Sequence, residues 1–133
     1  MLFKIHAQSA TPIYEQIMTQ VIFGVASGAL EAGARVPSVR DLADQLVVNP
    51  NTVARAFQEL ERRKVVQVRR GLGMEVTSEA PDICRAQQKQ IVRGRIREAL
   101  RLAASSALTA EEIRQIVEEE LNHVRGNGNG KRR

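Results

Sequence analysis

The stretch from Arg35 to Val76 reads RVPSVRDLADQLVVNPNTVARAFQELERRKVVQVRRGLGMEV. It contains two helical patterns separated by Asn49-Pro50, because asparagine is a good N-cap and proline suits the first position of a helix. Ser38, with Asp41 three residues later, resembles a capping box at the start of the first helix. The residues that form the two apolar inner faces are Val39, Leu42, Ala43 and Leu46, then Val53, Ala56, Phe57 and Leu60. The spacing predicts two short helices joined by a tight turn.

A short hairpin follows the second helix. Apolar residues alternate with polar ones on both of its arms, as they do in strands, at Val66, Val68, Met74 and Val76. Gly71 and Gly73 supply the positive φ that the turn between the arms needs. Helix, turn, helix and hairpin in this order predict a winged helix-turn-helix, a device that places its second helix in the major groove of DNA.

Further patterns flank this motif on both sides. Thr11-Pro12 opens a helix that ends near Ser27, and Leu2 to Ile5 is interpreted as a short strand. The apolar stripe of that helix consists of Ile13, Ile17, Val21 and Val25. Beyond Pro81, which marks a boundary, a long helical pattern continues to Ala103.

A last helix opens at Thr109, which forms a second capping box with Glu112. Its apolar face consists of Ile113, Ile116, Val117, Leu121 and Val124. The two C-terminal helices bury nothing if alone, so we expect a second copy of the chain to cover them, with packing onto the N-terminal part as the alternative. The predicted organisation is a winged domain at 1–80, a helical dimerisation segment at 81–125 and a disordered basic tail at 126–133. The predicted fold class is mainly α with a small β-wing.

Charge and composition narrow the classes of function. The formal charge of +5 is a weak hint of nucleic acid, and the local distribution is a stronger one, since six basic residues between Arg55 and Arg70 stand against Glu59 and Glu61. No apolar run approaches the length of a membrane span, and the N-terminus has no signal-peptide core. We therefore expect a cytoplasmic protein without a membrane partner.

Catalytic and metal-binding patterns do not stand out in the sequence. No Ser/His/Asp, Cys/His or metal-ligand spacing is evident, so we expect no enzyme, no metal and no cofactor. Cys84 is the only cysteine, which excludes an intrachain disulfide. Its neighbour Arg85 would favour the thiolate, but we expect an inert, partly buried thiol.

Asn51 and Thr52 stand in the first turn of the second helix of the motif, where a recognition helix presents side chains to base edges. Asparagine pairs bidentately with adenine, and threonine contacts a thymine methyl group or a phosphate. The alternative is that both residues only start the helix well. We favour DNA contact because of the surrounding motif.

Arginines supply the remaining candidate contacts. Arg40 begins the helix before the turn and can reach a phosphate or a guanine, unless it pairs with Asp44 one turn on. Arg55 lies on the outer face of the next helix and has Glu59 as its alternative partner. Arg69, Arg70 and Gly71 form the hairpin tip, where adjacent arginines gain little from protein contacts and a phosphate or a narrow minor groove would attract them. A solvated tip is the alternative.

These residues resemble a known family. Residues 30–43, LEAGARVPSVRDLA, resemble the N-terminal half of the GntR-family DNA-binding domain. Residues 48–61, VNPNTVARAFQELE, and the wing Arg-Arg-Gly-Leu-Gly resemble its second half. Asn-Pro-Asn-Thr-Val and the opening Pro-Ile-Tyr-Glu-Gln resemble the YtrA-type branch, which has a short two-helix dimerisation segment in place of an effector-binding domain.

The resemblance implies DNA contacts at Arg40, Asn49, Asn51, Thr52 and the wing residues Arg70 and Gly71. Two positions depart from the family, because Pro50 and Ala54 stand where many members carry arginine. The family's base preference is therefore not carried over to this chain.

The resemblance also implies a function. It implies a homodimeric bacterial repressor that binds an inverted-repeat operator, with targets that include transporter operons and its own gene. The small-molecule effector is not identified by the sequence. The alternative is a winged-helix protein-interaction module without specific DNA binding.

Overall fold

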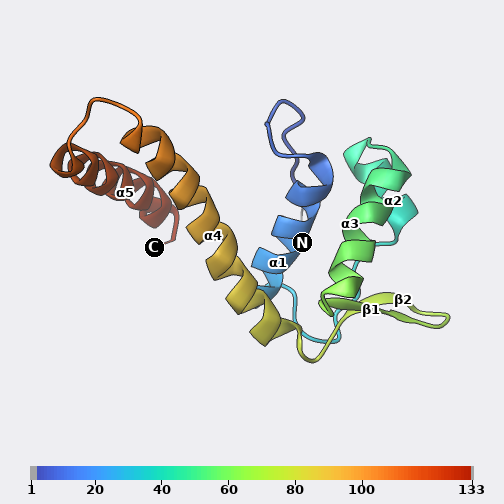
Figure 1. Cartoon of the computed structure of the whole chain (residues 1–133). Coiled ribbons are helices and arrows are strands. Elements are labelled where there is room, and N and C mark those ends of the chain that lie inside the picture. Colours follow the sequence, from blue (N-terminus) through green and yellow to red (C-terminus); the bar gives the residue numbers. More distant parts are fainter. Residues whose placement is uncertain (1–2, 133) are drawn as a thin grey trace. The chain divides into compact units, whose positions relative to one another are not determined.

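The computed structural model describes the backbone of residues 3–132 and the side chains of residues 3–126. The described chain consists of helices and one two-stranded antiparallel sheet that projects beside α3, so the predicted class, mainly α with a small β-wing, is confirmed (Figure 1). The elements are α1 (Ile13–Ser27), α2 (Val39–Leu46), α3 (Pro50–Arg62), β1 (Val66–Arg69), β2 (Gly73–Val76), α4 (Ala80–Ala104) and α5 (Ala110–Arg132). The chain forms two compact units, one that ends at Ile91 and one that begins at Val92.

Side-chain caps start the two helices of the motif as the sequence predicts. The Ser38 hydroxyl accepts the Asp41 N–H at 3.0 Å, at the start of α2. The Asn49 side chain accepts the Asn51 N–H at 2.8 Å, and Pro50 occupies the first position of α3. Because each cap satisfies an N–H that has no partner within the helix, the turn between the helices is fixed by local chemistry.

The hairpin forms at the predicted place, with Val66 opposite Val76 and Arg69 opposite Gly73. Gly71 and Gly73 adopt φ values of 77° and 83°, as the turn requires. A pairing absent from the sequence analysis adds a short third segment to this sheet. Val76 N–H donates to Ala34 C=O at 2.8 Å, and Val36 N–H donates to Met74 C=O at 3.1 Å. The wing is therefore tied to the segment before α2.

The core of the first unit lies between α1, α2, α3 and the hairpin. The predicted inner face of α3 is fully buried, whereas α2 buries Leu42 and Ala43 and leaves Val39 and Leu46 half-buried. α4 contributes as well, because Ala80 and Cys84 are buried in the same cluster. The apolar core therefore continues past the boundary that the sequence analysis drew at Pro81.

The first described residues form an extended segment rather than a strand, so the strand interpretation is wrong for residues 3–5. Side-chain amides on α1 take the place of a neighbouring strand. Gln16 accepts the His6 N–H at 2.7 Å and donates to the His6 C=O at 3.0 Å. Gln20 accepts the Lys4 N–H at 2.7 Å and donates to the Lys4 C=O. Each glutamine thus binds one residue of the segment at both backbone groups.

The turn between α2 and α3 contains a strained residue. Val47 ends α2 with φ 54° and ψ 53°, in the left-handed region. A β-branched side chain rarely adopts this conformation, because its Cβ crowds the backbone. The side chain is 89% exposed, so it gains little from burial in return.

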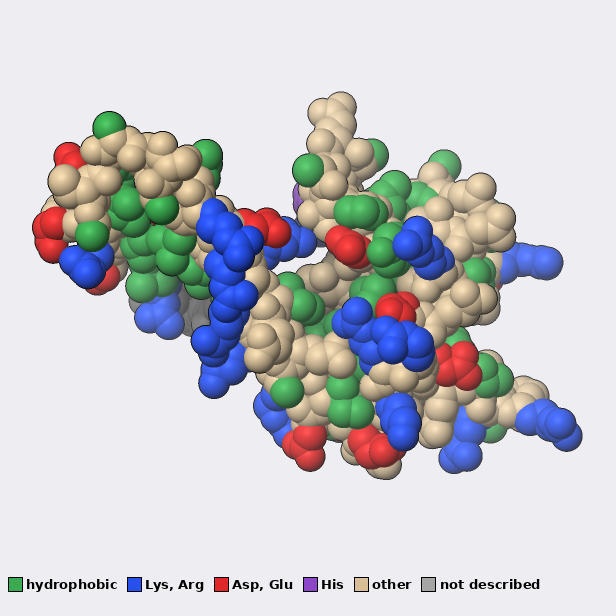
Figure 2. All heavy atoms as spheres, in the orientation of Figure 1, with side chains coloured by type: hydrophobic (Ala, Val, Ile, Leu, Met, Phe, Trp, Pro, Cys, Tyr) green, Lys and Arg blue, Asp and Glu red, His purple; other side chains and the backbone are tan. Residues whose placement is uncertain are grey.

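The second unit contains the end of α4 and all of α5. Before α5, the Thr109 hydroxyl accepts the Glu112 N–H at 3.1 Å and the Glu112 carboxylate accepts the Thr109 N–H at 2.8 Å, which confirms the predicted capping box. Hydrophobic side chains gather along α4 and α5 of this unit in Figure 2. The large exposed ones are Val92, Ile96, Leu100, Leu102, Leu108, Ile116, Val117, Leu121 and Val124.

The end of α5 bears on the predicted tail. The helix extends to Arg132, beyond Gly126, where the sequence analysis expects order to end. The side chains of residues 127–133 lie outside the description, so the disordered tail at 126–133 stays a prediction. Among the helices described, none is both long and apolar enough to cross a lipid bilayer.

Candidate nucleic-acid interface

The N-terminus of α3 presents the predicted base-reading residues. Asn51 is exposed and Thr52 is half-buried, both in the first turn of the helix. Asn49 is exposed too, but its side-chain oxygen is occupied by the cap bond to Asn51 N–H. Only the amide nitrogen of Asn49 is therefore left to donate to a ligand. Asn51 is the exposed side chain in this group whose amide offers a donor and an acceptor side by side, whereas the hydroxyl of Thr52 is half-buried.

Arg40 lies exposed in the first turn of α2. An ion pair with Asp44, four residues further along α2, is its alternative role. Among the described residues no salt bridge joins these two side chains. Its guanidinium is therefore available to an external anion.

Arg55 has a different partner from the one considered in the sequence analysis. Its guanidinium carbon lies 3.8 Å from the centroid of the Tyr14 ring, a cation–π contact between α3 and α1. Glu59, the alternative partner, instead binds Arg62 at 2.5 and 2.7 Å. Among the described residues no salt bridge joins Arg55 to Glu59, and the charge of Arg55 makes only a minor contribution to the lowered pKa of that carboxyl. No local pattern in the sequence points to Tyr14 as the partner of Arg55, because the two residues lie far apart in the chain.

The charge on Glu59 is stabilised within α3. Its hydrogen bond to Arg62 is the main cause that lowers the pKa of the carboxyl below its ordinary value, and burial opposes this effect. The same pair raises the pKa of Arg62. Arg63 adds a weaker contact to the same carboxylate at 3.9 Å. This carboxylate is thus shared by two arginines near the end of α3.

The two wing arginines are not equivalent. Arg69 forms an ion pair with Glu75 on the facing strand, so the expectation that the tip gains little from protein contacts is wrong for this residue. Arg70 is exposed and takes part in none of the ion pairs found in the described part of the chain. Lys and Arg side chains project from the end of the hairpin in Figure 2. Gly71, beside Arg70, is exposed and leaves the backbone accessible.

Cys84 has no reactive surroundings. It is buried, and burial raises the pKa of its thiol to about 11. The suggestion that Arg85 favours the thiolate is therefore wrong, and that guanidinium instead pairs with Asp82 at 2.5 Å. Within residues 3–126 no group of three or more His, Cys, Asp or Glu side chains is placed to hold a metal ion.

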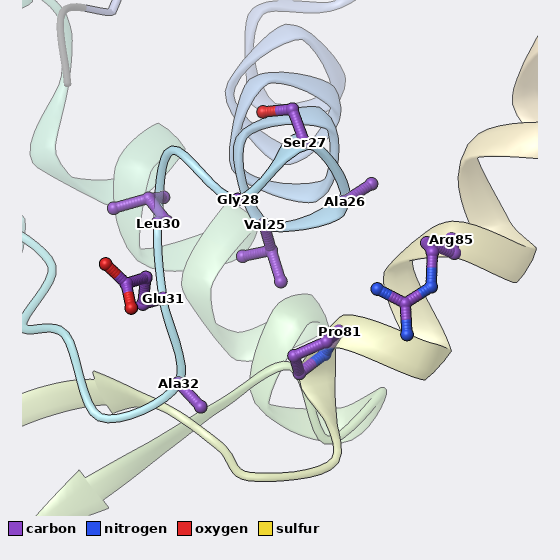
Figure 3. A pocket seen from close by; sticks show the side chains of 9 residues that line it. All are labelled: Val25, Ala26, Ser27, Gly28, Leu30, Glu31, Ala32, Pro81 and Arg85. Carbon is purple, nitrogen blue, oxygen red and sulfur yellow. The ribbon is translucent and has the colours of Figure 1, made fainter.

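A cavity of about 350 Å³ lies between the end of α1, the loop after it and the start of α4 (Figure 3). Val25, Leu30 and Pro81 contribute apolar walls, and Glu31 and Arg85 contribute the charges. Its polar side chains are all exposed, so the cavity is open to solvent and its geometry selects no ligand.

Comparison with known proteins agrees with this geometry. Residues 13–76 match the family described as "Bacterial regulatory proteins, gntR family". The chain is 30% identical over 125 residues to the HTH-type transcriptional repressor YtrA of Bacillus subtilis, covering 94% of this chain and 96% of the relative.

Two solved structures are similar over most of their length. One is YtrA from Sulfolobus acidocaldarius, a GntR-family transcription factor, with 35% identity, a TM-score of 0.57 and coverage of 75% of this chain and 98% of that one. The other is a transcriptional antiterminator from Listeria monocytogenes, with 31% identity, a TM-score of 0.68 and coverage of 90% of both chains. The chain therefore belongs to the GntR family of DNA-binding transcriptional regulators and is a YtrA-like member of it.

Proposed function

We propose that this chain is a cytoplasmic repressor that binds an inverted-repeat operator as a homodimer. The observation that carries the proposal is the exposed N-terminus of α3, where Asn51 offers a donor and an acceptor to a base edge. Repression follows if the operator overlaps a promoter. The printed name of the Bacillus subtilis relative, a transcriptional repressor, supports that direction. Transporter operons and the chain's own gene are the proposed targets.

The DNA contacts divide into two classes. Asn51 and Thr52 read base edges from the first turn of α3. Arg40, Arg70 and the amide of Asn49 bind phosphates, together with the backbone around Gly71. Arg69 contributes less, because Glu75 already neutralises it. The unpaired state of Arg40 and Arg70 supports this division, since a charge without a protein partner is free to release counterions on DNA.

Dimerisation is proposed to use the second unit. Exposed apolar residues recur at intervals of three or four, at Ile96 and Leu100 on α4 and at Val117, Leu121 and Val124 on α5. A surface helix with an uncovered apolar stripe gains stability by burying that stripe against another helix. A second copy of the same unit supplies a matching stripe, as symmetric dimers do.

The test begins with selection of a binding sequence from a randomised duplex library by the wild-type protein. Asn51→Ala should lose about 1–3 kcal/mol of discrimination at one position of each half-site. Arg70→Ala should weaken binding to all sequences and lower the slope of affinity against salt by about one per protomer. Affinity measurements on single-base variants of the selected duplex separate the two effects.

Lys89→Ala is the matched control for Arg70→Ala, because Lys89 is an exposed cation on α4 with no proposed DNA role. It should leave the salt slope unchanged. If the wild-type protein enriches no sequence from the library, specific DNA binding fails and the protein-interaction alternative gains support. Unchanged discrimination in Asn51→Ala would remove that residue from base reading.

A further inference from the structure

Tyr14 and Arg55 meet across two helices of the first unit. Tyr14 is half-buried near the start of α1, and Arg55 is exposed on α3. The guanidinium carbon lies 3.8 Å from the ring centroid, well inside the ~6 Å range of a cation–π interaction. Since a free arginine samples many rotamers, a fixed ring beneath its head restricts where the charge lies.

This contact orients the charge and places no carboxylate on the guanidinium, since Glu59 acts on Arg55 only weakly and at a distance. The nearest candidate carboxylate on α3 is Glu59, which binds Arg62 at 2.5 and 2.7 Å. An aromatic ring covers one face of a guanidinium, whereas the five N–H donors lie in the guanidinium plane. Donors at the edge of Arg55 therefore stay available to an anion, unlike those of Arg62.

The position of Arg55 on α3 indicates which anion. Arg55 follows Asn51 by four residues, so it lies one helical turn further along the same exposed face, roughly 6 Å along the axis. A helix whose first turn reads base edges brings its following turn toward the sugar-phosphate backbone at the rim of the groove. A phosphate is thus the ligand that this charge and place fit.

We propose that Tyr14 is a positioning residue for DNA binding, whose ring holds Arg55 in place for a phosphate at the rim of the major groove. The inference rests on the DNA binding proposed above and adds a residue outside the recognition helix to it. Tyr14 acts through Arg55 and does not itself need to touch DNA. The ring, rather than the hydroxyl, is the part that matters.

The experiment compares four variants on two probes, the duplex selected by the wild-type protein and a scrambled duplex of equal length. Tyr14→Leu, which removes the ring and keeps an apolar side chain, should weaken binding to both probes by about 2- to 5-fold. Tyr14→Phe, which keeps the ring, should bind as wild type. Arg55→Gln should also lower the salt slope by about one per protomer. The double variant Tyr14→Leu with Arg55→Gln should bind no more weakly than Arg55→Gln alone.

Two matched controls isolate the contact. Phe23→Leu removes another half-buried ring of α1, and Lys89→Gln removes an exposed cation of α4 without releasing Glu59 from Arg62. Both should leave the salt slope unchanged. Thermal unfolding of every variant shows whether it is folded in the assay, and Arg55→Gln probes the same contact from its exposed end without disturbing the core.

Three results would overturn the inference. One is wild-type binding by Tyr14→Leu, and another is additive losses in the double variant, which would mean a purely structural tyrosine. The third is a loss confined to one base pair of the selected duplex, which would make Arg55 a base contact. If the wild-type protein selects no sequence, the proposed function fails instead. If it selects one and the variants behave as wild type, only the role of Tyr14 fails.

Discussion

The two units of this chain treat their apolar side chains in opposite ways. The first unit buries its large ones, including Phe57, Ile17 and Leu42, in a core closed by helices and a hairpin. The second unit exposes Leu121 and Val124, at 48% and 63%, on a helix whose apolar face no other described segment covers fully. One chain thus contains a closed core and, in its second unit, an apolar surface that the described residues leave exposed. Apolar content alone does not distinguish the two, because the same residue types serve both.

Removing the second unit should give the largest effect. A chain that ends at Ile91 keeps Ala80 and Cys84 in the core and should fold as a monomer. Without its partner, each winged domain should bind the operator about 10²–10⁴-fold more weakly, because the second half-site is no longer tethered. Sedimentation and operator titration measure the two outcomes. A tight dimer after this cut would place the interface in the first unit.

A cut after Ala80 sharpens the comparison. It removes Cys84, which is fully buried, so this shorter chain should also unfold at lower urea concentration than the one that ends at Ile91. Equal stability of the two chains would show that the start of α4 contributes little to the core.

Alanine in place of one large side chain in each unit should give effects of different kinds. Phe57→Ala should lower the free energy of unfolding by about 3–5 kcal/mol, because it leaves a cavity in a closed core. Leu121→Ala should change the stability of the monomeric form by less than about 0.5 kcal/mol. The same substitution should instead weaken the dimer, with a loss of about 1–3 kcal/mol in the free energy of dimerisation. Urea unfolding and dilution series separate these quantities, and a monomer strongly destabilised by Leu121→Ala would contradict the open second unit.

The rate at which the Cys84 thiol is alkylated measures how readily the core of the first unit opens. At pH 8 the native protein should resist alkylation by iodoacetamide, and should react only after unfolding in urea, because the thiol is buried and protonated. Ser105→Cys in a Cys84→Ala background, with an exposed thiol between α4 and α5, is the matched control and should react at once. Fast labelling of native Cys84 would show that the core opens readily.

The raised pKa of Cys84 fixes the direction of its pH effect. Burial raises the pKa of the Cys84 thiol in the folded protein to about 11, whereas the ordinary value is 9.0. Between these two values the folded state holds the proton more tightly than the unfolded state does. The stabilising contribution of the buried thiol is therefore complete below pH 9 and is lost as the pH rises toward 11. Wild type should therefore lose stability over that interval relative to Cys84→Ala, which cannot titrate there. A stability difference between the two proteins that stays constant from pH 9 to pH 11 would contradict this prediction.

The features that the sequence predicts well are those with a local cause. Ser38 and Asn49 cap the helices that follow them, and Gly71 and Gly73 take the positive φ of the hairpin turn. Each depends on neighbours a few residues away, so the pattern alone is sufficient. The position of Asn51 in the first turn of α3 follows from the cap at Asn49.

The features that the sequence does not predict depend on distant partners. Ala34 and Val36 join the sheet because tertiary folding brings them to β2. Arg69 meets Glu75 through the hairpin register, and Arg55 meets Tyr14 through the packing of α1 on α3. A candidate site can thus be located from sequence, whereas the state of each charge in it requires the fold.

The strained Val47 has a consequence for how this regulator can change over generations. Its exposed side chain adds little to the core, and its left-handed backbone at φ 54° suits glycine or asparagine better than valine. Replacing Val47 with glycine or asparagine should therefore relieve the backbone strain and stabilise the folded protein. Val47 lies two residues before Asn49, the N-cap of the helix whose first turn is proposed to contact the bases. A lineage that alters its operator by destabilising changes in α3 has a compensating position within the same turn.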